Sequence, residues 1–157
     1  MTTASETAIS VDDPRKPELR ALLERHLAFC LSETPPEHSF ALDVNRLLDP
    51  AVTFVSYRDG GTVLGVAAIK ELDAAQVEIK SMHTTAEARG RGVGRALLTH
   101  LLDTARERGY RRVLLETGTT PGFAAARALY ESAGFTPTGP FGGYPETGDN
   151  CFYAQAL

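Results

Sequence analysis

Hydrophobic residues recur every three or four positions in three segments of this 157-residue chain, with polar residues between them. This period is typical of amphipathic helices. Helix-breaking residues support the ends of the predicted helices. Pro35-Pro36 follows the first segment, and Gly109 and Gly134 follow the last two, where glycine suits a helix C-terminus. The predicted helices span residues 17–31, 93 to near 109, and 123–132. A shorter helix is predicted from about residue 40 to 48, ended by Asp49-Pro50, because the residue before a proline disfavours the helical conformation.

Other segments alternate hydrophobic and polar residues or form short apolar runs, which predicts β-strands. Asp59-Gly60-Gly61 separates two of these runs, and its turn chemistry predicts a hairpin. Neither a repeat nor a linker divides the chain, so we expect one domain over residues 1–157, with residues 1–8 as a loose tail. The expected strands span residues 9–11, 52–55, 63–69, 76–83, 112–117, 135–138 and 151–156.

Composition favours small-molecule chemistry. The net charge of -4 gives no overall electrostatic reason to bind nucleic acid or an anionic membrane. No window approaches the roughly 20 apolar residues that span a bilayer, so we expect a cytoplasmic protein. Cys30 and Cys151 lie far apart, and His26 and His100 are expected on helix surfaces without ligand spacing. We therefore expect neither a disulfide nor a metal site.

The stretch Arg89-Gly90-Arg91-Gly92-Val93-Gly94 lies between a predicted strand and the third helix. Amide groups at a helix N-terminus lack intrahelical acceptors, the helix dipole adds positive charge there, and glycines let an anion approach. The spacing is neither the Rossmann pattern nor a P-loop, since Arg95-Ala96 follows the last glycine. The stretch predicts a phosphate site, because its three glycines together with Arg89, Arg91 and Arg95 make a simple tight turn the weaker interpretation.

A second motif, further along the chain, makes it possible to relate the glycine-rich stretch to one protein family. Arg89-x-x-Gly92-x-Gly94 followed by Leu129-Tyr130-x-x-x-Gly134-Phe135 resembles the acetyl-CoA signature of the GNAT superfamily of N-acetyltransferases. The resemblance implies a mixed α/β (α+β) fold: a mostly antiparallel central sheet of about six to seven strands, flanked by about four helices, with splayed central strands. It also implies direct acetyl transfer from acetyl-CoA to an amine in a ternary complex.

In similar proteins the pantetheine arm of acetyl-CoA lies between the two splayed strands, which correspond here to residues 76–84 and 112–117. The resemblance implies that backbone groups of Met82, His83 and Thr84 contact this arm, and that an amide near Met82 or His83 faces the thioester oxygen. The phosphates are assigned to the first motif. The implied cofactor-binding residues are Met82, His83, Thr84, Arg89, Gly90, Arg91, Gly92, Val93 and Gly94.

Tyr130 is the candidate acid for the departing thiolate. A phenol has a reference pKa of about 10, so it stays protonated at neutral pH and can donate a hydrogen bond or proton to sulfur. The family resemblance gives it the same role.

Glu78 is the first candidate for a general base and Glu116 the second, because both lie on strands expected to frame the acceptor; His83, expected near the thioester, is the third. Glu78 is equally suited to an ion pair on an exposed sheet face, and many similar enzymes have no dedicated base.

The acceptor is the least defined partner. We expect a primary amine of a small molecule or amino acid, bound by loop residues 32–40 and by the loop around Phe141 and Tyr144, with His38 and Ser39 as weak candidates. Phe123 departs from the family pattern, in which Asn often contacts the pantetheine arm. An acyl-CoA sensor without turnover and a protein N-terminal or lysine acetyltransferase remain alternatives, and a homodimer is left open.

Overall fold

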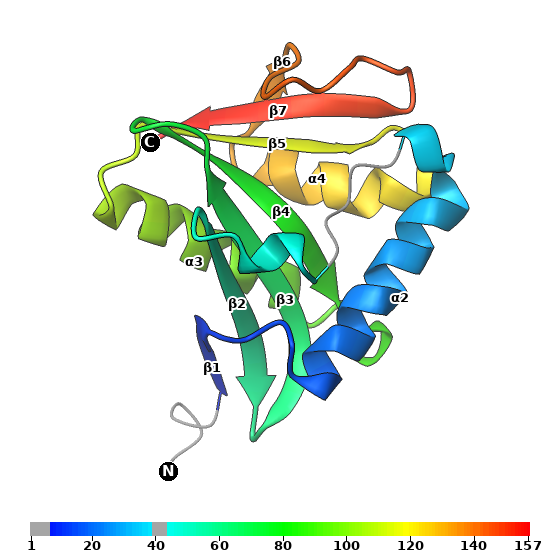
Figure 1. Cartoon of the computed structure of the whole chain (residues 1–157), viewed down its shortest axis with the longest axis vertical. Coiled ribbons are helices and arrows are strands. Elements are labelled where there is room, and N and C mark those ends of the chain that lie inside the picture. Colours follow the sequence, from blue (N-terminus) through cyan, green and yellow to red (C-terminus); the bar gives the residue numbers. More distant parts are fainter. Residues whose placement is uncertain (1–6, 39–43) are drawn as a thin grey trace.

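The computed structural model describes residues 7–38 and 44–157, and its seven strands form one sheet (Figure 1). The strand order is β1-β2-β3-β4-β5-β7-β6, and every neighbouring pair is antiparallel except β4 and β5. The mixed, mostly antiparallel sheet is therefore confirmed. The strands are β1 (Thr7–Val11), β2 (Val52–Asp59), β3 (Thr62–Glu71), β4 (Gln76–Thr84), β5 (Arg112–Gly118), β6 (Thr136–Thr138) and β7 (Asn150–Ala156).

In the described parts of the chain three α-helices cover the sheet: α2 (Pro17–Glu33), α3 (Val93–Glu107) and α4 (Ala124–Ser132). Four were predicted. Of the helix expected over residues 40–48, residues 40–43 lie outside the described residues, and Arg46–Leu48 forms the short 3-10 helix η2. Likewise residues 1–6 of the expected tail are not described, whereas Thr7 and Ala8 belong to β1. The remaining 3-10 turns are η1 (Pro36–His38), η3 (Ala86–Ala88) and η4 (Pro121–Phe123).

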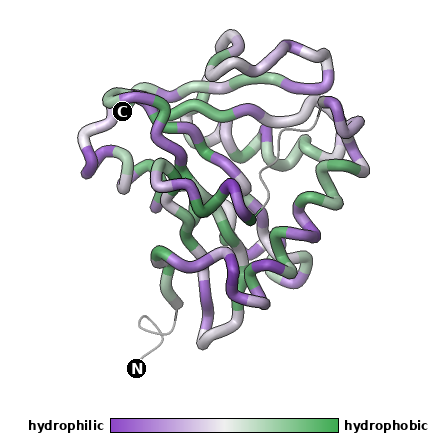
Figure 2. The backbone as a smooth tube through the Cα atoms, viewed as in Figure 1, coloured by the Kyte–Doolittle hydropathy of each residue, from purple (hydrophilic) through white to green (hydrophobic). Residues whose placement is uncertain are grey.

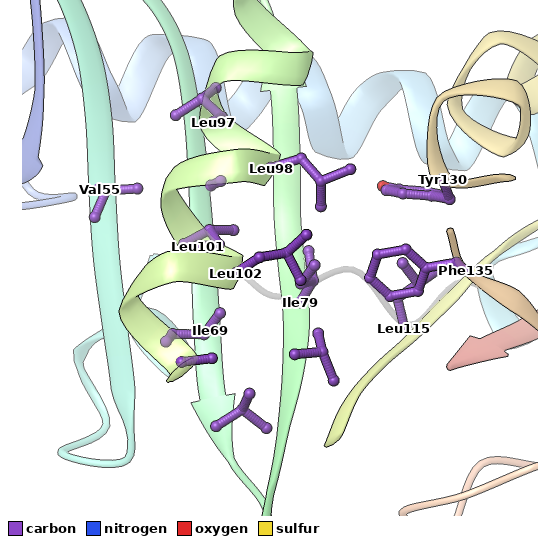
Figure 3. Packing of buried hydrophobic residues seen from close by; sticks show 14 of the residues in the cluster. Val55, Ile69, Ile79, Leu97, Leu98, Leu101, Leu102, Leu115, Tyr130 and Phe135 are labelled. Carbon is purple, nitrogen blue, oxygen red and sulfur yellow. The ribbon is translucent and has the colours of Figure 1, made fainter. Parts of the chain in front are cut away.

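The two faces of the sheet have separate cores. Leucines of α3 occur at helical spacing and point at the sheet, where they form one cluster with strand residues, Tyr130 and Phe135 (Figure 3). On the opposite face, three leucines of α2 pack with residues of η2, β2 and β3. Along α2 and α3, hydrophobic and hydrophilic stretches alternate (Figure 2), as one-sided burial requires. The leucines of α3 are Leu97, Leu98, Leu101 and Leu102, and those of α2 are Leu19, Leu22 and Leu23.

Two irregularities of β4 open the middle of the sheet. The pairing with β5 runs from Gln76↔Arg112 to Ile79↔Leu115 and does not continue between the described residues beyond it, so the two strands diverge (Figure 1). In the antiparallel pairing with β3, the register shifts between Val66 and Ala68, opposite Ser81, whose φ of 55° lies in the left-handed region. This β-bulge re-aims the side chains that follow it.

No helix among the described residues is long and apolar enough to cross a bilayer.

Candidate active site

The glycine-rich turn gives α3 an uncapped, positively polarised start. Its N-cap is Gly92, with φ of 79° and ψ of 12°, so no cap side chain accepts hydrogen bonds from the first amides of the helix. The first intrahelical bond runs from the Ala96 amide to the Gly92 carbonyl at 3.0 Å. The amides of Val93, Gly94 and Arg95 therefore precede this ladder and can bind an anion.

A cavity of about 470 Å³ lies at this turn, between β4 and α4. It is lined by β4 residues after the bulge, by the turn, and by one side of α4. The residues assigned to the cofactor from the sequence come together here with one exception. Those that line the cavity are Met82, His83, Thr84, Arg89, Gly90, Gly92, Val93 and Gly94.

Arg91 is the exception among the predicted residues. Its guanidinium faces Asp59 at 3.9 Å instead of the cavity. Arg95, the third arginine expected to add charge at the phosphate site, lines the cavity and donates a hydrogen bond to the Ser132 hydroxyl at 3.0 Å. Arg89 and Arg95 thus supply the cationic side chains at this cavity.

A second, smaller cavity of about 110 Å³ adjoins the first in the gap between β4 and β5. Its lining comes from α2, from β4 around the bulge, from β5, from α4 and from the loop before β7. Five residues line both cavities, so the two meet there: His26, Met82, Phe123, Ala126 and Tyr130.

Tyr130 lies at this junction, fixed by α4 and by the larger core. Its ring packs edge-on against Phe135, and its hydroxyl lies 3.9 Å from the sulfur of Met82. Burial raises the pKa of Tyr130 to about 12. The hydroxyl is therefore a permanent hydrogen-bond donor at the meeting point of the cavities.

Glu78 is buried away from both cavities. Its carboxylate accepts a hydrogen bond from the Tyr144 hydroxyl at 2.5 Å and lies 3.3 Å from the Lys80 ammonium. Lys80 also donates a hydrogen bond to the Tyr144 hydroxyl. Glu78 is 3% exposed, so these neighbours, rather than a substrate, surround its charge.

Glu116, the second candidate base, lines the smaller cavity. Burial raises the pKa of this carboxyl to about 7, although a hydrogen bond with Asn150 and the charge of Lys80 act in the opposite direction. A carboxyl that titrates near neutrality inside a cavity is suited to accept a proton at the working pH.

His26 was expected on a helix surface, and that expectation is wrong. Its Nδ1 lies 3.2 Å from Nδ1 of His83, across the gap between α2 and β4, and its Nε2 lies 3.8 Å from the Cys30 sulfur. Burial lowers the pKa of both histidines to about 4. A proton on His26 would also be repelled by one on His83, and a proton on His83 by the Arg89 guanidinium, which lowers each pKa further. Both rings are therefore neutral at physiological pH.

This histidine pair makes stability depend on pH. The folded chain keeps both rings neutral, whereas the unfolded chain takes up protons below about pH 6.5, so the free energy of unfolding falls as the pH drops from 6.5 towards 4. Glu116 acts oppositely, because its raised pKa lets the folded chain keep a proton that the unfolded chain releases. A comparison of variants separates the two effects.

We expect the stability difference between the wild type and the His26→Asn/His83→Asn double variant to decrease by about 2 kcal/mol from pH 7 to pH 4.5. This value is smaller than the sum for two independent histidines, because the two rings interact with each other and because water in the cavities screens their charge. Urea unfolding across this pH range measures it. A stability difference that does not change with pH would contradict the inference that both histidines are neutral in the folded chain.

The loop before β7 contributes to the site differently from the prediction. Phe141 and Tyr144 pack against each other and against Phe152, and neither lines the smaller cavity. Asp149 from the same loop does line it, as does Thr34 after α2. Ser39 lies outside the described residues, and the same holds for the side chain of His38.

Phe123 takes the place of the family's asparagine and fills space. Its ring packs against Phe29 with centroids 5.2 Å apart, and it lies so close to Gly118 that a Cβ there would come within 2.2 Å of it. Gly122 beside it donates a backbone hydrogen bond to Glu33 at 3.1 Å. These contacts tie the start of α4 to α2 and β5, which shapes both cavities.

A half-opened sheet with an anion-binding helix start beside it is the architecture of an acyl-CoA-dependent transferase. Residues 18–135 match the model of the acetyltransferase (GNAT) family, and the chain belongs to this family. The described part of the chain contains no cluster of three or more metal-ligating side chains.

Two curated relatives span nearly the whole chain. The uncharacterized N-acetyltransferase YsnE of Bacillus subtilis is 39% identical over 95% of this chain and 99% of its own length. The uncharacterized N-acetyltransferase YedL of Escherichia coli is 42% identical over 87% of this chain and 86% of its own. The protein is thus an acetyltransferase.

Solved structures share the fold. The putative acyl-CoA N-acyltransferase of Klebsiella pneumoniae superposes with a TM-score of 0.78 at 25% identity, covering 96% of this chain and 97% of its own. A GNAT acetyltransferase from Elizabethkingia anophelis with acetyl-CoA bound reaches 0.72 at 17% identity, covering 97% and 99%. The family fold is therefore one that binds acetyl-CoA.

Proposed function

We propose that this acetyltransferase moves an acetyl group from acetyl-CoA to a primary amine of a small molecule, by direct attack when both substrates are bound. The observation that carries this proposal is the meeting of two cavities at Tyr130, in the gap between β4 and β5. The larger cavity suits the donor and the smaller one the acceptor.

The donor site fits acetyl-CoA on three counts. The amides of Val93, Gly94 and Arg95 precede the hydrogen-bond ladder of α3, Arg89 and Arg95 add cationic charge, and β4 beyond its bulge is separated from β5. We assign the pyrophosphate to the turn and the pantetheine arm to the backbone of β4 at Met82, His83 and Thr84. Acetyl-CoA supplies a thioester, whose acetyl group is activated for attack by an amine.

Three groups of the chain then take part in the transfer. Glu116 accepts the proton that the amine loses as its nitrogen bonds to the acetyl carbon. A backbone amide near Met82 or His83 faces the carbonyl oxygen and stabilises its developing charge. As the carbon–sulfur bond breaks, Tyr130 donates a hydrogen bond to the sulfur, which leaves with the bonding electrons. Because the pKa of Tyr130 is about 12, well above that of a thiol, stabilisation by a hydrogen bond is favoured over complete proton transfer.

Glu116 replaces Glu78 as our first choice for the base. Glu116 lines the acceptor cavity, whereas the carboxylate of Glu78 is engaged by Tyr144 and Lys80 behind it. We assign Glu78 the role of holding Lys80 and Tyr144 in place.

The basic test is release of coenzyme A thiol with a panel of primary amines. We expect amine-dependent release, and mass spectrometry should find the acetyl group on the amine nitrogen. Tight binding of acetyl-CoA without release for any amine would instead support a non-catalytic sensor. Acetylation of peptides but of no small amine would support a protein acetyltransferase.

Donor binding is tested at the N-cap of α3. Gly92 adopts a left-handed conformation, which costs an alanine about 1–2 kcal/mol and would shift the amides that follow. We therefore expect Gly92→Ala to raise the Kd for coenzyme A about 10-fold, measured by titration calorimetry.

Gly109 offers a matched control, because it has a φ of 85° beyond the other end of the same helix and no atom within 4 Å of an added Cβ. Gly109→Ala should lower stability by a similar amount but leave the Kd unchanged. Equal Kd values for both variants would argue against phosphate binding at the turn.

A further inference from the structure

Three side chains form a hydrogen-bonded chain that crosses from the smaller cavity to the larger one. The Cys30 sulfur lies 3.8 Å from Nε2 of His26, and Nδ1 of His26 lies 3.2 Å from Nδ1 of His83. Cys30 lines the smaller cavity, His26 lines both, and His83 lines the larger. None of these side chains has a role in the proposed transfer.

The contact between the two histidines requires that their rings be opposite tautomers. Both rings are neutral at physiological pH, because burial lowers each pKa to about 4, so each has one N–H group and one bare nitrogen. Two Nδ1 atoms can form a hydrogen bond only if one carries a proton and the other does not. The ring with the bare Nδ1 therefore has its proton on Nε2.

Cys30 sets the direction of this chain. Burial raises the pKa of its thiol to about 11, so the sulfur keeps its proton, and Nε2 of His26 is its hydrogen-bond partner among the described residues. If the thiol donates to Nε2 of His26, then His26 donates from Nδ1 and the proton of His83 lies on Nε2. In the reverse direction the buried thiol proton would have no acceptor among the described residues, which disfavours that arrangement.

Nε2 of His83 is the free end of the chain. The atom has no hydrogen-bond partner among the described residues, yet it is not one of the two buried side-chain atoms without a partner, which are Ser81 Oγ and Gln155 Oε1. It is therefore open to solvent. Because α2 holds the other nitrogen of the ring and His83 lines the larger cavity, Nε2 is the polar atom that this side chain offers there.

A neutral N–H group at this place suits a carbonyl oxygen of the donor. His26 and Tyr130 both line the junction of the cavities, and His83 contacts His26, so its ring lies next to the site assigned to the thioester. An N–H donor stabilises the negative charge that develops on the carbonyl oxygen as the amine attacks. A role as base is poorly served by a ring nitrogen with a pKa of about 4.

We propose that His83 donates a hydrogen bond from Nε2 to the acetyl carbonyl oxygen of acetyl-CoA, and that His26 and Cys30 position it by fixing its tautomer. The ring acts beside the backbone amide assigned to the same oxygen and keeps its proton throughout the transfer. This inference rests on the proposed function and adds a catalytic side chain to it. His26 and Cys30, which act through His83, are positioning residues.

The tautomers can be measured directly. Long-range 1H–15N spectra of the histidine rings, recorded on the wild type at neutral pH, show which nitrogen of each ring carries the proton. We expect Nδ1–H in His26 and Nε2–H in His83. The reverse assignment, or rings that exchange between both tautomers, would overturn the inference. This measurement does not depend on any substrate.

Two substitutions of His83 test its N–H group. His83→Leu should lower kcat about 100-fold at saturating substrates and pH 8, because one donor to the developing charge is lost. His83→Gln keeps an amide N–H that can reach the position of Nε2, so its kcat should stay within about 10-fold of the wild type. An unchanged kcat in His83→Leu, or an equal loss in both variants, would overturn the inference.

Binding of coenzyme A separates the acetyl carbonyl from the rest of the donor. Coenzyme A lacks this carbonyl, so its Kd should stay close to the wild-type value in both His83 variants, which also shows that they are folded. A hydrogen bond from His83 to the pantetheine arm would instead raise the Kd of coenzyme A in His83→Leu and would overturn the inference. Titration calorimetry measures this Kd.

A double-mutant cycle tests whether His26 acts through His83. His26→Leu should lower kcat about 10-fold in the wild-type background, because the tautomer of His83 is no longer fixed, and should have no further effect in His83→Leu. His100, a histidine of α3 that lines neither cavity, provides the control, and His100→Leu should leave kcat unchanged. Effects of the His26 and His83 substitutions that multiply would overturn the positioning role. Absence of turnover with any amine in the wild type, with the tautomers as expected, would instead contradict the proposed function itself.

Discussion

Tyr130→Phe should lower kcat at saturating acetyl-CoA by about 100-fold, with little change in the affinity for coenzyme A. The substitution removes one oxygen atom from the junction of the two cavities and leaves the ring in its packing against Phe135. Among the described residues the hydroxyl bonds to the weakly accepting sulfur of Met82 alone, at 3.9 Å, so stability should change by less than about 1 kcal/mol. Steady-state kinetics of thiol release measure the effect.

Tyr153 provides a matched control. It is also a buried tyrosine of the larger core, with its ring centroid 6.4 Å from that of Tyr130, but its hydroxyl donates to Glu131 and it lines neither cavity. Tyr153→Phe should lower stability by about 1 kcal/mol and leave kcat near the wild-type value. If Tyr130→Phe keeps full turnover, another group must stabilise the leaving thiolate.

Glu116→Gln should lower kcat/KM for the amine about 100-fold at pH 8 and change its pH profile. With a pKa of about 7, Glu116 is ionised above neutrality, so its protonation should contribute a further factor of about 10 per pH unit to the fall of the wild-type kcat/KM below pH 7. The glutamine variant should lose this pH-dependent decrease of kcat/KM, the limb of the pH profile near pH 7. A second limb, from the titration of the amine itself, should remain in both proteins near the pKa of the free amine.

Glu78→Gln is the informative comparison. Its carboxylate lies behind the cavity wall, bonded to Tyr144 and Lys80, so this variant should keep the limb near pH 7 even if the loss of its ion pair reduces stability. A limb that disappears in Glu78→Gln and persists in Glu116→Gln would return the role of base to Glu78.

Much of the fold could be predicted because its elements have strong local signals. The leucine spacing of α3 and the Asp59-Gly60-Gly61 turn each depend on a few neighbouring residues, and both were predicted at the positions where the structure has them. The weak point was residues 40–48, which were predicted as a helix that ends before Asp49-Pro50. Its described end, Arg46–Leu48, is a 3-10 turn before Asp49-Pro50, in which Leu47 packs on the sheet and Leu48 is exposed, so no long amphipathic face forms there.

The donor side of the candidate site could be predicted equally well, because its signal also lies in neighbouring residues. Glycines and arginines at a helix start indicate an anion site by themselves, and most of the assigned residues line one cavity. The acceptor side was not predictable in this way. His26, Ser81 and Glu116 come from a helix, a bulge and a different strand, and only the tertiary structure shows that they share a cavity. The pKa of Glu116 likewise depends on burial, which the sequence does not give for a single residue.

The divergence of β4 and β5 has a consequence for how such a protein changes its substrate over time. The glycine-rich turn and the first turn of α3, which we assign to the phosphates, are one continuous stretch, whereas the smaller cavity, which we assign to the acceptor, is lined in part by α2, β5 and the loop before β7. Substitutions in those segments leave the turn unchanged. One half of the reaction can thus stay constant in a lineage while the other diversifies, since the two are encoded by separate parts of the chain.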